Sequence, residues 1–388
     1  MKKKIKIIQI TTSSPSFSVN NYEKEIFNGW YARVAYALKK ERPSIDVECW
    51  VPEKNYKKEE LKYNEGITFR IFPTTLSVRH GMEISLDVLS ALKEEIKKSS
   101  DNGGELIIHL HEYHSWLAYS ILLIAPKSVK IIAQHHGGRS PIGNLLKYPR
   151  LLIFSPAILA MWFSERFLFK KIKIFYSLSD VESAYLSSIA KKSEIKFQTM
   201  GIDESYFKEG NKVLARKKLH LDGRKKYIIF LGRVKTTKGI KELIDAMKNI
   251  NAELLVIGEG VDFEKYKNYV EENKLERVKF LGPKYNEEKK SYLDACDLLV
   301  LPSYTEGAPV VLMEALAKNR PVVATDVGGI KKMIVDGREG KIIEPKSTEE
   351  IVTAVNEVLE WPKKNLKKYA EKYKWKNIIL ETMRDYEK

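Results

Sequence analysis

The chain has 388 residues, more than a single hydrophobic core usually serves, so we expect two domains of about 150–200 residues each. Its 44% of hydrophobic and 10% of aromatic residues exclude a disordered or fibrous protein. The formal net charge of +16 favours anionic partners such as a phosphorylated substrate, nucleic acid or an anionic membrane surface, unless it serves only to solvate the surface.

The N-terminus and the cysteines together predict a cytoplasmic protein. The lysines at positions 2–4 are followed by only a short apolar stretch, Ile5–Ile10, which predicts a strand rather than a signal peptide. Cys49 and Cys296 are too few and too far apart for a disulfide framework or a metal site, which fits a reducing compartment.

Short β-branched runs alternate with amphipathic stretches, which is typical of parallel sheets built from βαβ units. Residues 1–205 are expected to form one Rossmann-like domain, with helices at Gly29–Lys40 and Ile84–Lys98. Its predicted strands are Ile5–Ile10, Asp46–Trp50, Thr68–Phe72, Leu106–Leu110, Lys130–Gln134 and Ile172–Tyr176.

The segment Leu151–Phe169 is almost wholly apolar and has basic residues on both sides. Pro156 and the charged pair Glu165–Arg166 interrupt it too much for a membrane-spanning helix. Two interpretations stay open: a buried core helix, or an interfacial helix that contacts a membrane surface.

The alternation resumes after the polar segment Gly201–Lys226, so residues 206–362 are expected to form a second Rossmann-like domain. Its predicted strands are Tyr227–Leu231, Glu253–Ile257, Val278–Leu281, Leu298–Leu301, Pro321–Ala324 and Gly340–Ile343. Its predicted helices are Ile240–Ile250, Phe263–Asn273, Glu287–Ala295, Val310–Ala317 and Thr348–Glu360, and a last helical stretch, Lys364–Tyr386, follows Pro362.

A basic loop, GRVKTTKG at residues 232–239, follows the predicted strand Tyr227–Leu231. Loops at the carboxyl ends of parallel strands gather along one edge of the sheet, and ligands bind there. The guanidinium of Arg233, the ammonium of Lys238 and the amides of the next helix would form a diphosphate site, with a basic surface loop as the alternative.

A second loop, PSYTEGAP at residues 302–309, follows Leu298–Leu301. Gly307 permits a close approach of the backbone to a ligand, and Pro309 suits the first position of a helix. Glu306 lies in this loop, while Glu314 lies on an otherwise apolar helix, where a carboxylate is costly unless it is paired or bound to a ligand. Sugar hydroxyls would satisfy both carboxylates.

Five stretches, GRVKTTKG, FLG, DLLVLPSYTEGAPVVLMEAL, PVVATDVGG and DGREGKIIEP, occur in this order and cover most of residues 227–345. The ordered set resembles the signature of the retaining glycosyltransferase family four, the glycosyl transferases group 1, whose architecture is called GT-B. The resemblance implies two Rossmann-like domains with parallel sheets facing a central cleft, a nucleotide-sugar donor bound by residues 206–362, and residues 363–388 packed back on the N-terminal domain.

The resemblance also implies roles for single residues. Arg233 and Lys238 correspond to the family's cationic pair, which stabilises the departing diphosphate. Glu306 corresponds to a carboxylate near the donor hexose, and Glu314 corresponds to one that holds the ribose. The donor-binding residues are then Gly232, Arg233, Lys238, Gly282, Glu306, Gly307, Ala308, Pro309, Val310 and Glu314, with Gly282 beside the base. Gly328 and Gly329 match a tight turn beside the donor, and they suit a turn equally well without one.

The first half resembles the family less closely. Leu106–Leu110 is followed by His111, to which we carry the family's active-site histidine and a contact with the transferred sugar or the acceptor; His109 is expected in the core. His135 and His136 follow the next strand and are expected on the acceptor side, with a plain loop as the alternative. Of the family's paired-glycine loop only Asn28-Gly29 remains, so the acceptor loop differs from the family pattern.

The resemblance implies retaining transfer of a hexosyl group, without a cofactor or bound metal, to a hydroxyl of a glycan, a lipid-linked acceptor or a small molecule, in polysaccharide or glycolipid biosynthesis. The sequence holds no Asp-x-Asp motif or Cys/His cluster, so no metal is expected.

A nucleotide-sugar epimerase of the same architecture and a catalytically silent donor-binding scaffold are alternatives. Nucleic-acid binding is disfavoured because no known module occurs. The expected location is cytoplasmic, with peripheral attachment to the cytoplasmic membrane face left open.

Overall fold

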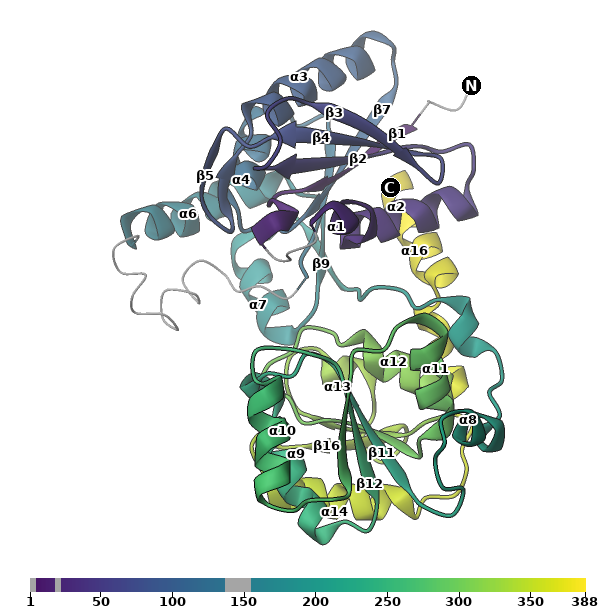
Figure 1. Ribbon diagram of the computed structural model, residues 1–388. Coiled ribbons are helices and arrows are strands. Elements are labelled where there is room, and N and C mark those ends of the chain that lie inside the picture. The colour runs from purple at the N-terminus through teal and green to yellow at the C-terminus, as the bar shows by residue number, and fades with distance from the viewer. Residues whose placement is uncertain (1–4, 18–21, 137–154) are drawn as a thin grey trace. The chain divides into compact units, whose positions relative to one another are not determined.

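A computed structural model describes residues 5–17, 22–136 and 155–388 of the chain. The chain divides into two units. The N-terminal unit comprises Met1–Gln198 and Ile379–Lys388, and the C-terminal unit comprises Thr199–Ile378 (Figure 1). The C-terminal end of the chain thus belongs to the same unit as its beginning. The first four positions of the expected segment Leu151–Phe169 lie outside the described residues.

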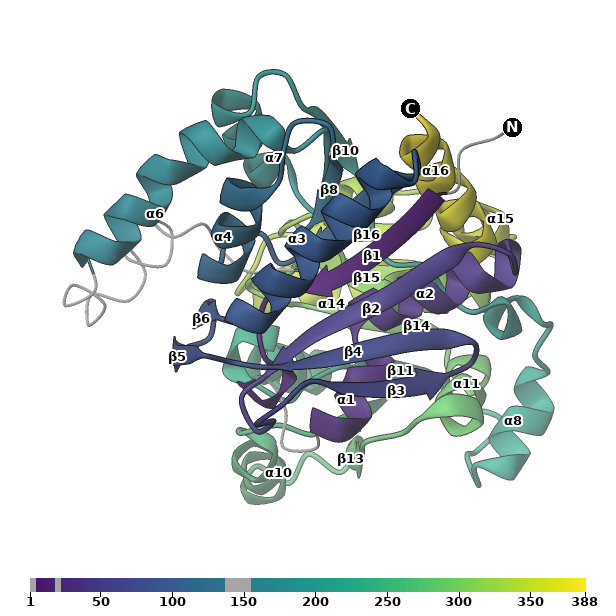
Figure 2. The same ribbon diagram turned by 90° about the horizontal axis from the view of Figure 1, so that it is seen from above.

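The N-terminal unit is built on an eight-stranded sheet in the order β10-β9-β8-β7-β1-β2-β4-β3 (Figure 2). All neighbours pair in parallel except β3 and β4. The strands are β1 Ile5–Thr11, β2 Asp46–Glu53, β3 Glu60–Asn64, β4 Ile67–Pro73, β7 Glu105–His111, β8 Lys130–Gln134, β9 Ile174–Ser177 and β10 Glu194–Phe197, and β5 Leu76–Arg79 and β6 Met82–Ile84 form a separate hairpin.

Helices cover both faces of this sheet. They are α1 Tyr22–Asn28, α2 Trp30–Glu41, α3 Leu86–Asp101, α4 Trp116–Ile124, α6 Ser155–Leu168 and α7 Asp180–Ile189, to which the end of α16 Trp375–Glu387 adds. Ser85, Ser115 and Ser179 begin α3, α4 and α7 by accepting a hydrogen bond from an amide in the first turn.

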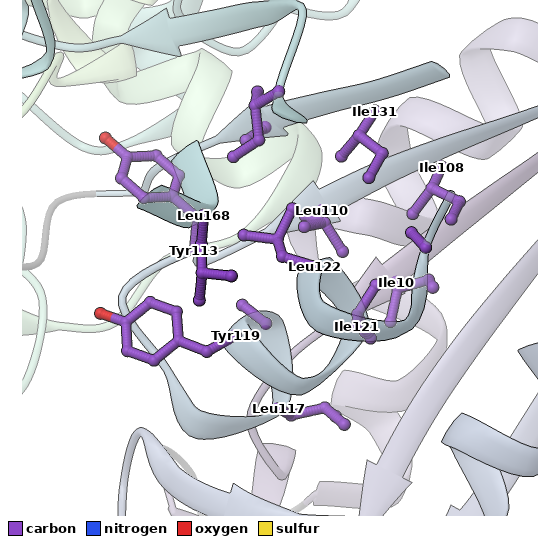
Figure 3. Packing of buried hydrophobic residues seen from close by; sticks show 14 of the residues in the cluster. Ile10, Ile108, Leu110, Tyr113, Leu117, Tyr119, Ile121, Leu122, Ile131 and Leu168 are labelled. Carbon is purple, nitrogen blue, oxygen red and sulfur yellow. The ribbon is translucent and has the colours of Figure 1, made fainter. Parts of the chain in front are cut away.

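The two faces of the sheet differ in chemistry. Ile10, Ile108, Leu110 and Ile131 point into an apolar core formed with α3, α4, α6 and α7 (Figure 3). Because side chains alternate along a strand, Gln9, His109, His111 and Gln134 point to the opposite face, and all four are buried there. The helices α2 and α16 cover this face (Figures 1 and 2). A line of polar side chains is therefore buried between the sheet and these helices.

The C-terminal unit holds a six-stranded, all-parallel sheet in the order β13-β12-β11-β14-β15-β16. Its strands are β11 Tyr227–Leu231, β12 Glu253–Ile257, β13 Val278–Gly282, β14 Leu298–Leu301, β15 Val322–Thr325 and β16 Gly340–Ile343. Its helices are α8 Lys212–Lys218, α9 Ile240–Ala246, α10 Phe263–Glu272, α11 Asn286–Ala295, α12 Val310–Ala317, α13 Ile330–Met333, α14 Thr348–Leu359 and α15 Lys367–Ala370.

The predicted fold class, α/β with two Rossmann-like parallel sheets, is confirmed. Several element predictions were wrong. Ile84 ends β6 rather than beginning a helix, because Ser85 caps α3. The stretch Lys364–Tyr386 is not one helix: α15 ends at Ala370, and Lys374 adopts an extended conformation before α16. The strands β3, β5, β6 and β10 were not predicted.

Candidate active site

The loops at the carboxyl edge of the C-terminal sheet are joined by backbone hydrogen bonds. Val234 N donates to Glu259 O at 2.9 Å, and Tyr304 N donates to Thr237 O at 2.9 Å. Gly329 N donates to Gly307 O at 2.7 Å. The loops after β11, β12, β14 and β15 therefore form one connected surface, as the rule for parallel sheets predicts.

Glycines are required where these loops touch. A Cβ added to Gly258 would lie 1.8 Å from Gly232 O, and one added to Gly328 would lie 2.2 Å from Glu306 O. Gly328 and Gly239 also have φ angles of +62° and +66°, which other residues rarely adopt. Because it has no Cβ, Gly258 lets the loop after β12 pack against the loop that carries Arg233.

The expected cation and carboxylate of the donor site meet directly. Lys238 Nζ lies 2.5 Å from Glu306 Oε1, and both side chains are largely buried. Ser303 Oγ donates to the same carboxylate oxygen at 2.6 Å, and its own carbonyl accepts from Thr325 Oγ1. The sequence analysis did not identify Ser303 as a site residue, although Ser303 lies only two residues after the end of β14.

Arg233 lies in the same loop with its side chain exposed. It makes no hydrogen bond or ion pair within the part of the chain that the structure describes. The amides of Gly307 and Ala308, which lead into α12, donate no hydrogen bond among the described residues either. One uncompensated guanidinium and two free amides are therefore present at this edge, and these are groups that bind phosphate oxygens.

Glu314 lies on α12, as predicted, but its carboxylate has a protein partner. Lys289 Nζ of α11 contacts both carboxylate oxygens, at 2.7 and 2.8 Å. Tyr206 also hydrogen-bonds Glu314, and burial followed by this carboxylate raises the pKa of the Tyr206 hydroxyl. The ion pair with Lys289 therefore offsets the cost of burying the Glu314 carboxylate, a role that the sequence suggested for sugar hydroxyls. No sequence signal marked Lys289, because it lies in a polar run typical of an exposed helix.

Two further residues of the predicted donor site, Gly282 and Pro309, lie at the ends of secondary-structure elements. Gly282 ends β13 with a φ angle of +69°, and its carbonyl accepts from Gly258 N at 3.0 Å. Pro309 is the residue before the helix rather than its first residue, and α12 begins at Val310.

In the N-terminal unit His111 is the last residue of β7 rather than the residue after it, and it is only 1% exposed. Its Nε2 lies 2.7 Å from Gln9 Oε1 and its Nδ1 lies 2.9 Å from His136 Nε2. The rings of Trp30, His136, His111 and His109 stack in sequence, with centroid separations of 5.4, 5.2 and 4.6 Å. His111 thus lies inside an aromatic column whose outer member, Trp30, is exposed.

The partners fix the proton positions in this column. A carbonyl oxygen such as Gln9 Oε1 only accepts, so His111 Nε2 carries the hydrogen and Nδ1 accepts from His136. Burial, followed by the neighbouring histidines, lowers the pKa of His111 and His136 well below the usual value, and burial lowers that of His109 to about 3. The column is neutral at ordinary pH.

His135 has the opposite character. Its Nδ1 lies 2.9 Å from Glu182 Oε1, and its Nε2 lies 3.3 Å from Glu112 Oε2. Burial opposes the charged form, but Glu112 and Glu182 outweigh it and raise the pKa of His135 to about 9. Tyr113 also donates to Glu182. The loop after β8 therefore contains a buried cation beside a neutral histidine.

The other acceptor-side residues are Asn28 and Gly29. Asn28 is exposed, and its amide donates to Lys24 O at 2.7 Å. Gly29 precedes α2, and an added Cβ would lie 2.6 Å from the ring of Tyr31. Gly29 thus lets α2 begin close to α1 and place Trp30 over His136.

The apolar segment is neither fully buried nor fully exposed. Met161, Leu168 and Phe169 are buried, whereas Leu159, Phe163 and Phe167 are 47%, 56% and 59% exposed. The three exposed residues are spaced by four along α6, so they lie on one side of the helix. A core helix that is buried on every side, one of the two interpretations left open, therefore does not describe this side of α6.

Glu165, which interrupted the apolar pattern, fastens α6 to the core. It is fully buried and accepts from His114 Nδ1 at 2.6 Å, from Tyr119 Oη at 2.6 Å and from Tyr185 Oη. None of the helices that the structure describes has the length and apolar character needed to span a bilayer.

Solved structures share this architecture over nearly the whole chain. Sucrose-phosphate synthase from Thermosynechococcus elongatus superposes with a TM-score of 0.73 over 98% of each chain at 18% identity. Anabaena HepE in complex with UDP superposes with a TM-score of 0.69 over 98% of this chain and 99% of its own, at 15% identity. At such identities the likeness defines the fold, which is that of the two-domain GT-B glycosyltransferases.

The sequence match is confined to the C-terminal half. Residues 211–375 match the family model "Glycosyl transferases group 1". An uncharacterized glycosyltransferase of Methanocaldococcus jannaschii is 32% identical over 175 residues, 44% of this chain and 50% of the relative. The chain matches about half the length, or less, of the first curated relatives. The match to the glycosyl transferases group 1 thus lies in the part of the chain where the motifs predicted it, and it covers less than half of the chain.

Proposed function

We propose that the protein is a glycosyltransferase that moves a hexosyl group, with retention of the anomeric configuration and without a metal ion, from a nucleotide-diphosphate sugar to an acceptor hydroxyl. The observation that carries this proposal is the group formed by Arg233, the Lys238–Glu306 pair and the free amides of Gly307 and Ala308 at one sheet edge. The family match of residues 211–375 supports glycosyl transfer in general.

In the proposed reaction the bond between the anomeric carbon and the diphosphate oxygen breaks, and a bond from the acceptor oxygen to that carbon forms on the same face. The acceptor proton passes to a departing phosphate oxygen. Negative charge develops on the diphosphate, and Arg233, Lys238 and the two amides stabilise it; Glu306 binds hydroxyls of the hexose and Glu314 those of the ribose. Preorganised contacts of this kind contribute about 3–4 kcal/mol each to lowering the barrier.

The donor base is left to experiment. A UDP complex is known for Anabaena HepE, a structural neighbour, and this makes uridine diphosphate the first ligand to titrate. We further propose that Gly282 lies beside the base and that Asn28, Gly29, His135 and His136 lie on the acceptor side. His111 positions His136 on the acceptor side, because both ring nitrogens of His111 already hydrogen-bond to protein groups.

We also propose a cytoplasmic location with attachment to the cytoplasmic membrane face through α6, where a lipid-linked acceptor is met. The support is the exposed row Leu159, Phe163 and Phe167 together with the cations Arg166 and Lys170, which lie against Trp162 and Phe167. Apolar side chains beside cations are the composition of an interfacial helix. Leu123 on α4, which packs on α6, is 67% exposed as well.

The experiment that tests the proposal measures nucleotide release and product stereochemistry together. Uridine, guanosine and adenosine diphosphates are first titrated by thermal shift, and the sugar nucleotides of the base that binds are incubated with glycan and lipid-linked acceptors. We expect nucleotide release only with an acceptor, and a product whose anomeric proton shows the configuration of the donor. Turnover of the sugar nucleotide without acceptor or nucleotide release would indicate an epimerase instead, and an inverted product would exclude the retaining mechanism.

A further inference from the structure

A cavity lies at the amino edge of the C-terminal sheet, opposite the edge that carries Arg233 and Lys238. It has a volume of about 780 Å³, within the range of small-molecule sites. Lys226, Asp297 and Arg320 line it at the amino ends of the strands: Lys226 and Asp297 directly precede β11 and β14, and Arg320 lies two residues before β15. Since strands of four or five residues span about 15 Å, the cavity is separated by that distance from the donor residues at the carboxyl ends.

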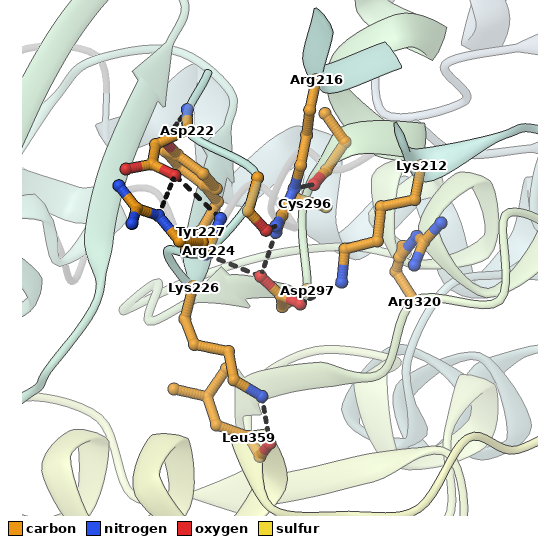
Figure 4. Close-up of polar contacts among 12 residues, drawn as sticks. Lys212, Arg216, Asp222, Arg224, Lys226, Tyr227, Cys296, Asp297, Arg320 and Leu359 are labelled. Atoms are coloured by element: carbon orange, nitrogen blue, oxygen red, sulfur yellow. Dashed lines mark hydrogen bonds and ion pairs between the residues drawn. The ribbon is translucent and has the colours of Figure 1, made fainter. Parts of the chain in front are cut away.

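The lining has an excess of positive charge. Five cations, Lys212, Lys226, Arg320, Lys363 and Lys364, face only two acidic residues, Glu209 and Asp297. Asp297 is already shared: it accepts from Lys212, from Arg216 Nη2 at 2.8 Å and from the amide of Tyr227 at 2.7 Å (Figure 4). The single carboxylate of Asp297 therefore pairs with two cations, Lys212 and the buried Arg216.

Three of the other four cations contact neutral groups. Arg320 donates to the carbonyls of Leu293 and Asp294, each at 3.0 Å, and Lys226 Nζ lies 3.3 Å from Leu359 O. Lys364 Nζ lies 3.7 Å from the centre of the Trp361 ring. None of these contacts neutralises charge.

Lys212 lies between Asp297 and the other cations of the cavity. Burial is the main cause that lowers the pKa of Lys212 below the usual value; its partner Asp297 opposes this shift, and Arg216 and Arg320 add to it. Lys212 therefore has cationic neighbours as well as a carboxylate partner.

The Asp297 network alone has a structural explanation, since it fastens α8 to the start of β11. It does not explain Lys226, Lys363, Lys364 and Arg320 around the same cavity. We propose that this cavity is a second ligand site, which binds the phosphate or diphosphate group of a small metabolite. Clustered lysine and arginine side chains recognise such groups through charge-assisted hydrogen bonds.

The test titrates small anions into the full-length Arg233→Ala, Lys238→Ala variant, in which the proposed donor site is impaired. Inorganic phosphate, pyrophosphate and glucose 6-phosphate are compared by calorimetry at about 0.1 M salt, where surface charges are partly screened. We expect one binding site, with pyrophosphate or the sugar phosphate preferred over phosphate. Preference between these two distinguishes a bare diphosphate from a phosphorylated metabolite.

Adding Lys226→Ala and Lys363→Ala should weaken this binding about tenfold or more, because two cations are removed. The matched control adds Lys248→Ala and Lys267→Ala, which are exposed and lie outside the cavity, and should leave the affinity unchanged. Melting temperatures check that each variant is folded.

Absence of heat with all three anions, or equal affinity in the Lys226/Lys363 and Lys248/Lys267 variants, would overturn the proposal. The outcome is independent of the proposed function. A chain that lacks glycosyl transfer could still bind an anion here, and an active transferase could fail to do so.

Discussion

Lys238 Nζ lies 2.5 Å from Glu306 Oε1, so the cation assigned to the departing diphosphate is paired with the carboxylate assigned to the transferred sugar. A bound nucleotide sugar would present phosphate oxygens to Lys238 and hydroxyl donors to Glu306. Each partner of the pair would then exchange a protein contact for a substrate contact, and Arg233, which has no partner to give up among the described residues, would contribute its full charge.

Arg233→Ala is expected to lower turnover roughly 100-fold or more, because one preorganised contact to the diphosphate is lost. Its melting temperature should stay unchanged, because the side chain is exposed and unpaired. Nucleotide release in the presence of acceptor measures the effect. Lys235→Ala, in the same loop and also exposed, is the matched control and should retain near-normal turnover. Near-normal transfer by the Arg233→Ala, Lys238→Ala double variant would refute the mechanism.

Glu306→Gln is expected to separate binding from turnover. Loss of the carboxylate charge leaves Lys238 uncompensated, so the affinity for the nucleoside diphosphate should rise about two- to tenfold. Turnover should fall, because the amide replaces the stronger acceptor for the sugar hydroxyls. Calorimetry and steady-state rates measure the two effects, and Ser303→Ala, which removes only a hydrogen bond to the carboxylate, serves as the control. A loss of diphosphate affinity in Glu306→Gln would contradict the assigned pairing.

Glu314→Gln distinguishes a ribose contact from a purely structural pair with Lys289. If the carboxylate holds the ribose, the variant should bind a nucleoside diphosphate about tenfold more weakly while its affinity for pyrophosphate at the same edge is unchanged. Lys289→Met tests the structural part: it leaves a mostly buried carboxylate unpaired and should destabilise the C-terminal unit by about 1–3 kcal/mol in urea unfolding. Equal losses for both ligands in Glu314→Gln would remove the ribose assignment.

The sequence predicted the carboxyl-edge loops of the C-terminal unit because parallel strands, glycines and the positions of Arg233, Lys238 and Glu306 all point to the same edge. It missed partners that are distant in the chain or lie in ordinary surface patterns. Lys289 belongs to a polar helix, and Gln9 contacts Tyr386 across 377 positions. The strands β3 and β10 are short and largely polar, so they lack the apolar runs on which strand prediction depends.

The protonation of His135 predicts a loss of stability at alkaline pH. Its pKa in the folded chain is about 9, above the usual 6.5, so the stabilisation is complete below pH 6.5 and is lost as pH rises to 9. We expect the free energy of unfolding of the N-terminal unit to fall by about 1–3 kcal/mol across this window. His135→Gln should be less stable at pH 6.5 and should show a flatter profile.

Urea unfolding at several pH values measures this effect. His220→Asn is the control, since His220 is exposed and its φ of +54° suits asparagine. An unchanged slope between pH 6.5 and 9 in His135→Gln would show that the charge is not held by Glu112 and Glu182. Below pH 6.5 His109 and His111 should lower the stability of the same unit, because their folded-state pKa values are lowered and only the unfolded chain takes up protons there.

Replacement of Leu159, Phe163 and Phe167 by serine tests the proposed membrane contact of α6. The three side chains are about half exposed and lie on one side of the helix, so their removal should cost little stability. It should reduce partitioning onto vesicles of mixed anionic and neutral lipids at least about tenfold, because apolar area is no longer inserted. The matched control replaces three exposed valines elsewhere, Val181, Val213 and Val261, and should partition like the unmodified chain.

Vesicles of different lipid charge separate the apolar contribution of the α6 side chains to membrane binding from the electrostatic contribution of Arg166 and Lys170. Neutral vesicles should bind the unmodified chain more weakly than anionic ones, because Arg166 and Lys170 then lack counter-charges. If the serine variant sediments with anionic vesicles as well as the valine control does, the cations alone account for the attachment and the apolar row on α6 has another role. If lipid-linked acceptors are the substrates, the serine variant should lose transfer to acceptors in vesicles while it keeps transfer to a detergent-solubilised acceptor.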